Sequence, residues 1–179
     1  MPLYDYDAFK ERMQTGCCIL WQGNDLLSKA IRIFSTYSHA SLVIRISEYA
    51  GIKNEVFLVE ALATGLELRG LWERIQNYNG CVFIFTPAWI TIDRQDKIGA
   101  FGLTECAKAV PYSYGGLLAN ILGRVSQHAR RWFCSQFVWA AYLDCAETCL
   151  KPTDKAPRPG DIPNWTCGNV DEIIVPGTA

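Results

Sequence analysis

The stretch that decides the fold is "SHASLVIRISEYAGIKNEVFLVEAL", residues 38–62. Two runs rich in β-branched and large apolar residues, 38–46 and 55–62, flank the polar segment 47–54. Such runs are typical of half-buried strands, and the short polar segment between them predicts a hairpin-like connection. The sequence therefore predicts an antiparallel pair of strands at the centre of the fold.

A histidine lies in the first of these strands. Successive side chains of a strand alternate between its two faces, so His39 shares one face with Ser41, Val43 and Arg45. That face is mixed in character and could line a cleft, whereas the opposite face is apolar. Taken alone, a histidine in a strand is more often structural than catalytic.

A carboxylate, Glu60, lies in the second strand among apolar residues. Burying a carboxylate is costly unless it is paired. A hairpin centred near residues 49 and 50 brings Glu60 opposite or close to His39 on the same face. There the carboxylate would fix the imidazole tautomer and stabilise its protonated form, although the sequence does not set the strand register.

Further elements complete an α+β pattern of antiparallel strands packed against helices. We expect helices over 5–14, 24–35 (capped by Asn24 or Asp25), 71–78, 93–109, 115–124 and 134–149, and further strands over 17–22, 66–70 and 81–87. The proline-rich segment 151–165 is expected to be a surface loop.

Length and composition bound the class of protein. The 179 residues predict a single domain, 1–179, and the half that is hydrophobic predicts a folded globular chain. A net charge of -1 gives no overall bias toward nucleic acid. No apolar run approaches the roughly 20 residues of a membrane-spanning helix, and the N-terminus lacks a secretory signal. We therefore expect no integral membrane segment and a cytoplasmic location, although a non-classical export route leaves no such signal.

A cysteine begins the apolar helical pattern in "RRWFCSQFVWAAY", residues 130–142. A helix N-terminus at Cys134 would stabilise a thiolate, which is the nucleophilic form of cysteine, and Arg130 and Arg131 could add to this effect. The alternative is a buried, inert thiol, which is the expectation for most of the eight cysteines in a cytoplasmic protein.

A cysteine nucleophile needs a base, and the chain has two histidines. His39 is the stronger candidate because His128 lies in a polar, basic stretch and is expected to be exposed. No pair of cysteines has the C-x-x-C spacing of a zinc site, so we expect no metal.

These motifs, together with "PYSYGG" (111–116) and "FCSQFVWAAY" (133–142), resemble the NlpC-type cell-wall peptidases of the papain-like cysteine hydrolase superfamily. The histidine strand precedes the cysteine here, which resembles the circularly permuted branch with its YiiX/YaeF-like and lecithin:retinol acyltransferase-like members. Residues 16–44 also resemble the opening of that branch. Two positions depart from it: Cys17 follows Gly16 where an acidic residue is common, and Gln136 follows the Cys-Ser pair.

The resemblance implies a role for each matched position. Cys134 would be the nucleophile, His39 the base and Glu60 the orienting residue, with no cofactor. Tyr112 would lie beside the nucleophile and support an oxyanion hole together with the Cys134 backbone amide. Tyr112 is equally well explained as an aromatic residue packed after Pro111.

The function implied is a thiol hydrolase that cleaves an amide or ester through an acyl-thioester. The substrate would be a peptide, such as a peptidoglycan stem peptide, or a lipid acyl bond. Two alternatives stay open at this point. One is acyl transfer to an acceptor other than water, and the other is a non-catalytic binding module on the same fold. The residues do not predict an oligomeric state.

Overall fold

The computed structural model describes residues 3–76, 78–108, 133–146, 150 and 155–173. Its elements follow the order α1 (Leu3–Glu11), β1 (Cys18–Gly23), α2 (Leu26–Arg32), β2 (His39–Tyr49), β3 (Ile52–Leu62), β4 (Gly65–Gly70), α3 (Leu71–Ile75), β5 (Gly80–Pro87), α4 (Ile92–Ala107), α6 (Cys134–Ala146), the 3₁₀ turn η2 (Pro159–Asp161), α7 (Ile162–Trp165) and β6 (Gly168–Ile173). The predicted α+β class, with an antiparallel sheet packed against helices, is confirmed.

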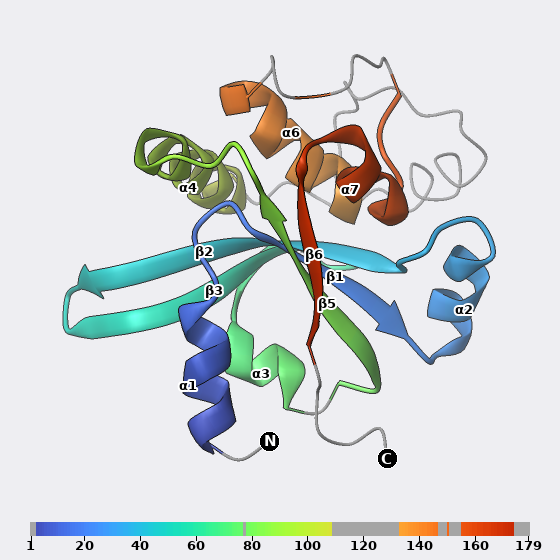
Figure 1. Cartoon of the computed structure of the whole chain (residues 1–179), viewed down its shortest axis with the longest axis horizontal. Coiled ribbons are helices and arrows are strands. Elements are labelled where there is room, and N and C mark those ends of the chain that lie inside the picture. Colours follow the sequence, from blue (N-terminus) through green and yellow to red (C-terminus); the bar gives the residue numbers. More distant parts are fainter. Residues whose placement is uncertain (1–2, 77, 109–132, 147–149, 151–154, 174–179) are drawn as a thin grey trace.

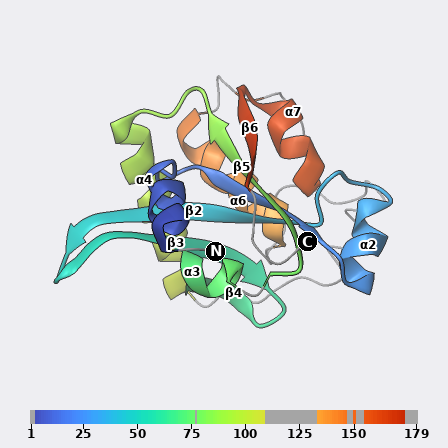
Figure 2. The same cartoon turned by 60° about the horizontal axis from the view of Figure 1, so that its bottom comes forward.

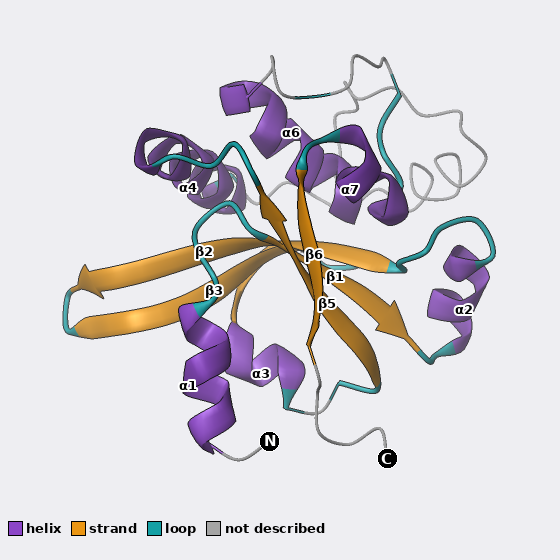
Figure 3. Ribbon diagram, in the orientation of Figure 1, coloured by secondary structure: helices purple, strands orange, loops and turns teal. Residues whose placement is uncertain are grey.

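The six strands form one sheet in the order β4-β3-β2-β1-β5-β6, and every neighbouring pair is antiparallel. Helices α4, α6 and α7 lie on one side of this sheet, and α1 and α3 lie on the other (Figures 1 and 3). Helix α2 lies beyond one end of the sheet, whereas the β2–β3 hairpin extends beyond the opposite end (Figure 1). With the bottom of the molecule turned forward, α1 and α3 lie in front of the strands (Figure 2).

Two apolar clusters fill the spaces on either side of the sheet. The first joins Leu42 and Ile44 of β2 to Phe137 and Val138 of α6. The second contains Val43 of β2 and the residues that α1 and α3 supply from the opposite side. Both faces of the central strands are therefore buried, which explains their nearly continuous runs of apolar residues.

The β2–β3 hairpin is longer, and its turn shorter, than predicted. Pairing continues to Tyr49 and Ile52, so only Ala50 and Gly51 form the turn. Both have positive φ, 51° and 86°, as two-residue hairpin turns of type I′ require. The predicted connection over 47–54 was therefore wrong. At the end of this hairpin, residues 47–53 are exposed on both faces of the strands. Their sequence therefore lacks the alternation of apolar and polar residues that indicates a strand.

The prediction of a loop over 151–165 was also wrong where the structure describes it. The segment forms η2 and α7, and the chain then adds β6 to the sheet beside β5. Proline is favoured in the first turn of a helix, so Pro159 and Pro163 begin these turns rather than only interrupting structure. Ile162 is fully buried in the first apolar cluster.

The remaining elements lie close to their predicted positions, with shifts of a few residues at their ends. Asp25 is the cap of α2, since its carboxylate accepts a hydrogen bond from the backbone of Ser28. At 16 residues, α4 is the longest described helix, and α6 is described only as far as Ala146. The helix predicted over 115–124 lies outside the described residues. None of the described helices has both the length and the hydropathy that crossing a membrane demands.

Ile162→Ala should lower the free energy of unfolding by about 2–5 kcal/mol, because it removes a fully buried side chain from the core. Ile92→Ala is a matched control, because the same side chain is 76% exposed there and its removal should change stability by less than about 0.5 kcal/mol. Urea unfolding of both variants measures the difference. Equal stability of the two variants would show that the C-terminal segment is not part of the folded core.

Candidate active site

His39 is the first residue of β2, where the strand emerges from the sheet. It pairs with Trp21 of β1, and its side chain is 19% exposed. The other residues on its face are not cleft residues, because Ser41 and Val43 are fully buried beneath α1 and α3. The expectation of a cleft along this face therefore holds only at its end, where His39 reaches a pocket.

Glu60 is fully buried, and its carboxylate is directed at the His39 ring, as the hairpin predicted. The distance between His39 Nε2 and Glu60 Oε1 is 2.9 Å. The register, in which Leu42 pairs with Val59, places Glu60 opposite Ser41 and diagonally across from His39. The Ser41 hydroxyl also donates to Glu60 Oε1, at 2.7 Å.

Arg74 of α3 supplies the positive charge that this buried carboxylate requires. Its Nη2 donates to Glu60 Oε1 at 3.3 Å, and its Nε donates to Oε2. The guanidinium also lies over the Trp21 ring, 5.1 Å from the ring centroid. Trp21 in turn donates its indole N–H to the Ser41 hydroxyl at 2.6 Å. The Trp21 ring therefore contacts both Ser41 and Arg74, which fixes these two donors around the carboxylate.

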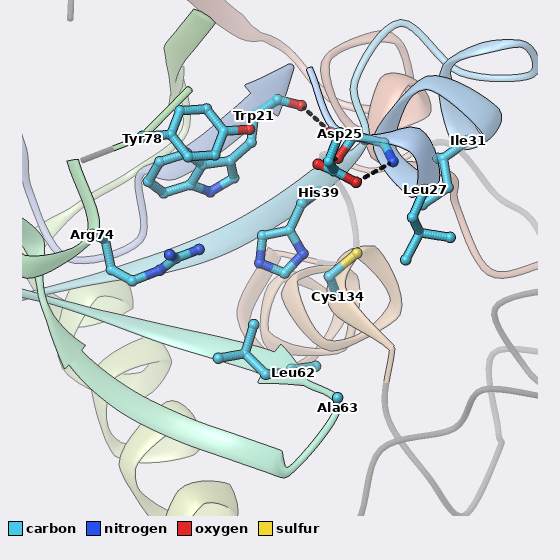
Figure 4. A pocket seen from close by; sticks show the side chains of 13 residues that line it. Trp21, Asp25, Leu27, Ile31, His39, Leu62, Ala63, Arg74, Tyr78 and Cys134 are labelled. Carbon is cyan, nitrogen blue, oxygen red and sulfur yellow. Dashed lines mark hydrogen bonds between the residues drawn. The ribbon is translucent and has the colours of Figure 1, made fainter. Parts of the chain in front are cut away.

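Cys134 begins α6, as the sequence predicted, and is 2% exposed. Its sulfur lies beside the His39 ring (Figure 4), and its surroundings of that ring and the backbone of Ala40 and Ser135 favour the thiolate. Because Nε2 of His39 faces Glu60, the second ring nitrogen, Nδ1, is the one toward the thiol (Figure 4). The helix start is anchored by Ser135, whose hydroxyl donates to the Pro157 carbonyl at 2.7 Å.

The pKa values of these three groups shift toward their charged forms. Burial lowers the pKa of His39, but the charge of Cys134 and its contacts with that group and Glu60 outweigh burial and raise it to about 10. Burial raises the pKa of Cys134, but the His39 charge and the hydrogen bonds from the ring and backbone outweigh it, so this pKa is lowered. Despite its burial, Glu60 has a pKa of about 2, because His39 and Arg74 donate to it.

Cys134 and His39 open onto a pocket of about 290 Å³. The sulfur and the ring face its interior, and the side chains of α2 form one of its walls (Figure 4). The other lining residues are Trp21, Asp25, Leu27, Ser28, Ile31, Ser38, Ala61, Leu62, Ala63, Arg74 and Tyr78. A mostly apolar pocket with a few converging polar groups is a typical small-molecule or substrate site.

Three of the four predicted site residues therefore meet at one point. Tyr112, the fourth, lies outside the described residues, as do His128, Arg130 and Arg131. Arg74 was not predicted from the sequence, although a buried carboxylate implies a cationic partner somewhere in the fold. Within the described part of the chain, no group of three or more His, Cys, Asp or Glu side chains is placed to hold a metal ion. The seven described cysteines are all free thiols.

Comparison with known protein families finds none that matches this chain, and comparison with curated proteins finds no match either. Among solved structures, the chain is similar to the crystal structure of the metalloprotein YiiX from Escherichia coli. The TM-score is 0.59 at 19% sequence identity, and the match covers 78% of this chain and 69% of YiiX. At this identity the likeness establishes a shared fold. The chain therefore has a YiiX-like α+β fold.

Proposed function

We propose that this protein is a cysteine hydrolase of the circularly permuted NlpC-type, papain-like superfamily, folded as one domain. The observation that carries the proposal is the arrangement at one pocket of the Cys134 thiol, the His39 ring beside it and the Glu60 carboxylate hydrogen-bonded to that ring. A thiol, a base and an orienting carboxylate in this sequence are the parts of a nucleophilic triad. The likeness to YiiX supports the fold on which the proposal rests.

In the first half-reaction, the Cys134 thiolate attacks the carbonyl carbon of an ester or amide in the pocket. The carbon–sulfur bond forms as electrons move onto the carbonyl oxygen, giving a tetrahedral oxyanion. When that oxyanion collapses, the bond to the leaving group breaks, and protonated His39 gives its Nδ1 proton to the departing alcohol or amine. The products of this step are an acyl-thioester on Cys134 and a neutral His39 ring.

In the second half-reaction, neutral His39 accepts a proton from water as the water oxygen attacks the thioester carbon. Collapse of the second tetrahedral species breaks the carbon–sulfur bond, releases the acid and restores the thiolate–imidazolium pair. An acceptor alcohol or amine in place of water would give acyl transfer by the same steps.

The oxyanion needs hydrogen-bond donors near Cys134. The first backbone N–H groups of a helix have no partner within that helix, so the Cys134 amide at the start of α6 is one donor in our proposal. Tyr112 is the second, as the resemblance to the permuted branch implies.

Glu60 and Arg74 act on the reaction through His39. The carboxylate holds Nε2 of the ring so that Nδ1 faces the sulfur, and it stabilises the charged ring. Arg74 keeps Glu60 ionised and fixed in position. We therefore regard Arg74 as a positioning residue in this site.

Cys134 should react with iodoacetamide at about pH 5, where a thiol of ordinary pKa, about 8.5, is almost entirely protonated. Burial raises the pKa of Cys17, Cys18, Cys106 and Cys145, so these thiols should stay unmodified. Mass spectrometry of the labelled peptides identifies the site.

His39→Ala is the control for this reactivity, because it removes the cation that stabilises the thiolate and should abolish labelling of Cys134 at this pH. Similar labelling of several cysteines, unchanged by His39→Ala, would mean that Cys134 is an ordinary core thiol.

Arg74→Gln should destabilise the protein by about 3–5 kcal/mol at neutral pH, because it leaves the buried Glu60 charge without its cation. A carboxyl with a depressed pKa stabilises the fold above its unfolded value of 4.5, and this contribution is lost as the pH falls through its folded value of about 2. Arg74→Gln raises the pKa of Glu60 in the folded protein. The difference in free energy of unfolding between this variant and the wild type should therefore narrow as the pH is lowered below about 4.5.

Arg69→Gln is the matched control for this prediction. Arg69 makes ion pairs with Glu67 and Glu73 near the surface, and their loss should cost at most about 1 kcal/mol. Urea unfolding at a series of pH values from neutral to about pH 3, below the ordinary pKa of a carboxyl, measures both variants. A gap for Arg74→Gln that is small, or independent of pH, would contradict the assigned role of this arginine.

Hydrolysis of chromogenic esters and peptide amides should depend on all three proposed groups. Cys134→Ala should remove turnover, and His39→Ala should lower kcat by roughly 10²–10⁴-fold, the usual contribution of a general base. Glu60→Gln should slow turnover more than it disturbs folding. Cys145→Ala serves as a control thiol substitution outside the pocket. Undiminished turnover in Cys134→Ala would exclude the proposed mechanism.

A further inference from the structure

Helix α2 and the turn that closes it expose an apolar face beside the pocket. We call this the α2 face and define it as Leu26, Leu27, Ala30, Ile33 and Phe34. Four of these side chains are strongly exposed: Leu26 by 87%, Leu27 by 61%, Ile33 by 75% and Phe34 by 50%. The other exposed large hydrophobic residues of the described chain are scattered over five other elements.

The spacing of this face is that of a helix side that normally packs on a core. Leu26, Leu27 and Ala30 lie on α2 itself, and Ile33, the αR C-cap, and Phe34 follow in the turn that closes the helix. Their spacing, i, i+1, i+4, i+7 and i+8, continues one helical stripe into that turn. The side of α2 that faces the protein is occupied instead by Ile31, which is 6% exposed. The outward stripe is therefore apolar without contributing to the core of the described structure.

Three cations lie beside the α2 face. Lys29 and Arg32 lie in the last turn of α2 and are exposed. Arg158 approaches from η2, where its Nη1 donates to the Phe34 carbonyl at 3.1 Å. The nearby acid Asp25 is turned back into the helix cap, where it accepts hydrogen bonds from Ser28. The edge of the apolar stripe is therefore positively charged.

The α2 face lies both at one extremity of the described structure and next to the pocket. The helix lies beyond the end of the sheet, at one extremity of the described structure (Figure 1). Leu27 belongs both to the α2 face and to the lining of the pocket that holds Cys134 (Figure 4). Any partner that binds to the α2 face therefore also contacts the mouth of the pocket.

We infer that the α2 face docks on an anionic lipid bilayer. An apolar helix side that is flanked by lysine and arginine is the pattern of helices that lie in the membrane interface. The apolar side chains enter the acyl boundary, while Lys29, Arg32 and Arg158 meet the lipid phosphates. Docking in this way brings the pocket mouth to the lipid–water interface. The inference goes beyond the proposed chemistry and does not depend on it.

The test is flotation of the intact protein with vesicles of phosphatidylcholine alone, or of equal parts phosphatidylcholine and phosphatidylglycerol. We expect binding to the anionic vesicles, weaker binding to the neutral ones, and a loss of binding as salt is raised. Leu26→Ser/Ile33→Ser should weaken partitioning at least about tenfold, because each exposed side chain contributes its burial in the bilayer. Lys29→Gln/Arg32→Gln should weaken it roughly fivefold per cation on the anionic vesicles.

Matched controls are available at other exposed positions. Tyr49→Ser/Ile92→Ser removes two side chains of similar exposure, 72% and 76%, and should leave binding unchanged. Lys53→Gln/Lys108→Gln removes two exposed cations elsewhere and should have little effect. Cys134→Ala should bind vesicles as the wild type does, so failure of the proposed chemistry would leave the docking result intact.

Three results would overturn the inference. The first is wild-type protein that does not float with anionic vesicles. The second is binding that Leu26→Ser/Ile33→Ser leaves unchanged. The third, measured by light scattering in the absence of lipid, is a wild-type dimer that this double substitution converts to a monomer, since the α2 face would then be the seat of a second copy of the chain.

Discussion

The candidate site depends on one electrostatic constraint, which is the compensation of the fully buried Glu60 carboxylate. A lone ionised carboxyl in this position would be protonated or would destabilise the fold by several kcal/mol. Here His39, Ser41 and Arg74 all donate to it, so it remains charged. Because it remains charged, it favours a protonated His39 ring, and that ring in turn favours the Cys134 thiolate. The four ionisable groups alternate in sign along this line, and each stabilises the charge of the next.

Two elements bring these groups together, the β2–β3 hairpin and the N-terminal end of α6. The hairpin fixes Glu60 and His39 relative to each other, since the two-residue turn at Ala50 and Gly51 sets the register of β2 and β3. Helix α6 packs against the same sheet and starts where β2 begins, so its N-terminal end faces the ring. His39 is accessible because it is the first residue of its strand, whereas Ser41 and Val43 on the same face are covered.

Much of this arrangement could be predicted from the sequence, because its signals are local. Alternation and β-propensity predicted the two strands, the isolated acid predicted the Glu60 contact, and the apolar helical pattern predicted that a helix starts at Cys134. What was missed lacks such a signal. Strand β6 is an exposed edge with the polar sequence "GNVDEI", and η2 and α7 lie among prolines that also indicate loops. Arg74 is one of two charged residues on its helix, and only the three-dimensional packing of α3 against the hairpin distinguishes it.

The central claim is that the Cys134 thiol and the His39 ring form an ion pair, and the charge state of His39 tests it most directly. NMR titration of protein labelled at histidine follows its ring, while His128, the second histidine of the chain, serves as an internal reference. The account predicts that His39 stays protonated well above the ordinary pKa of 6.5, toward about 10, and that Cys134→Ala lowers this value. A His39 ring that titrates near 6.5, with or without the Cys134 thiol, would contradict it.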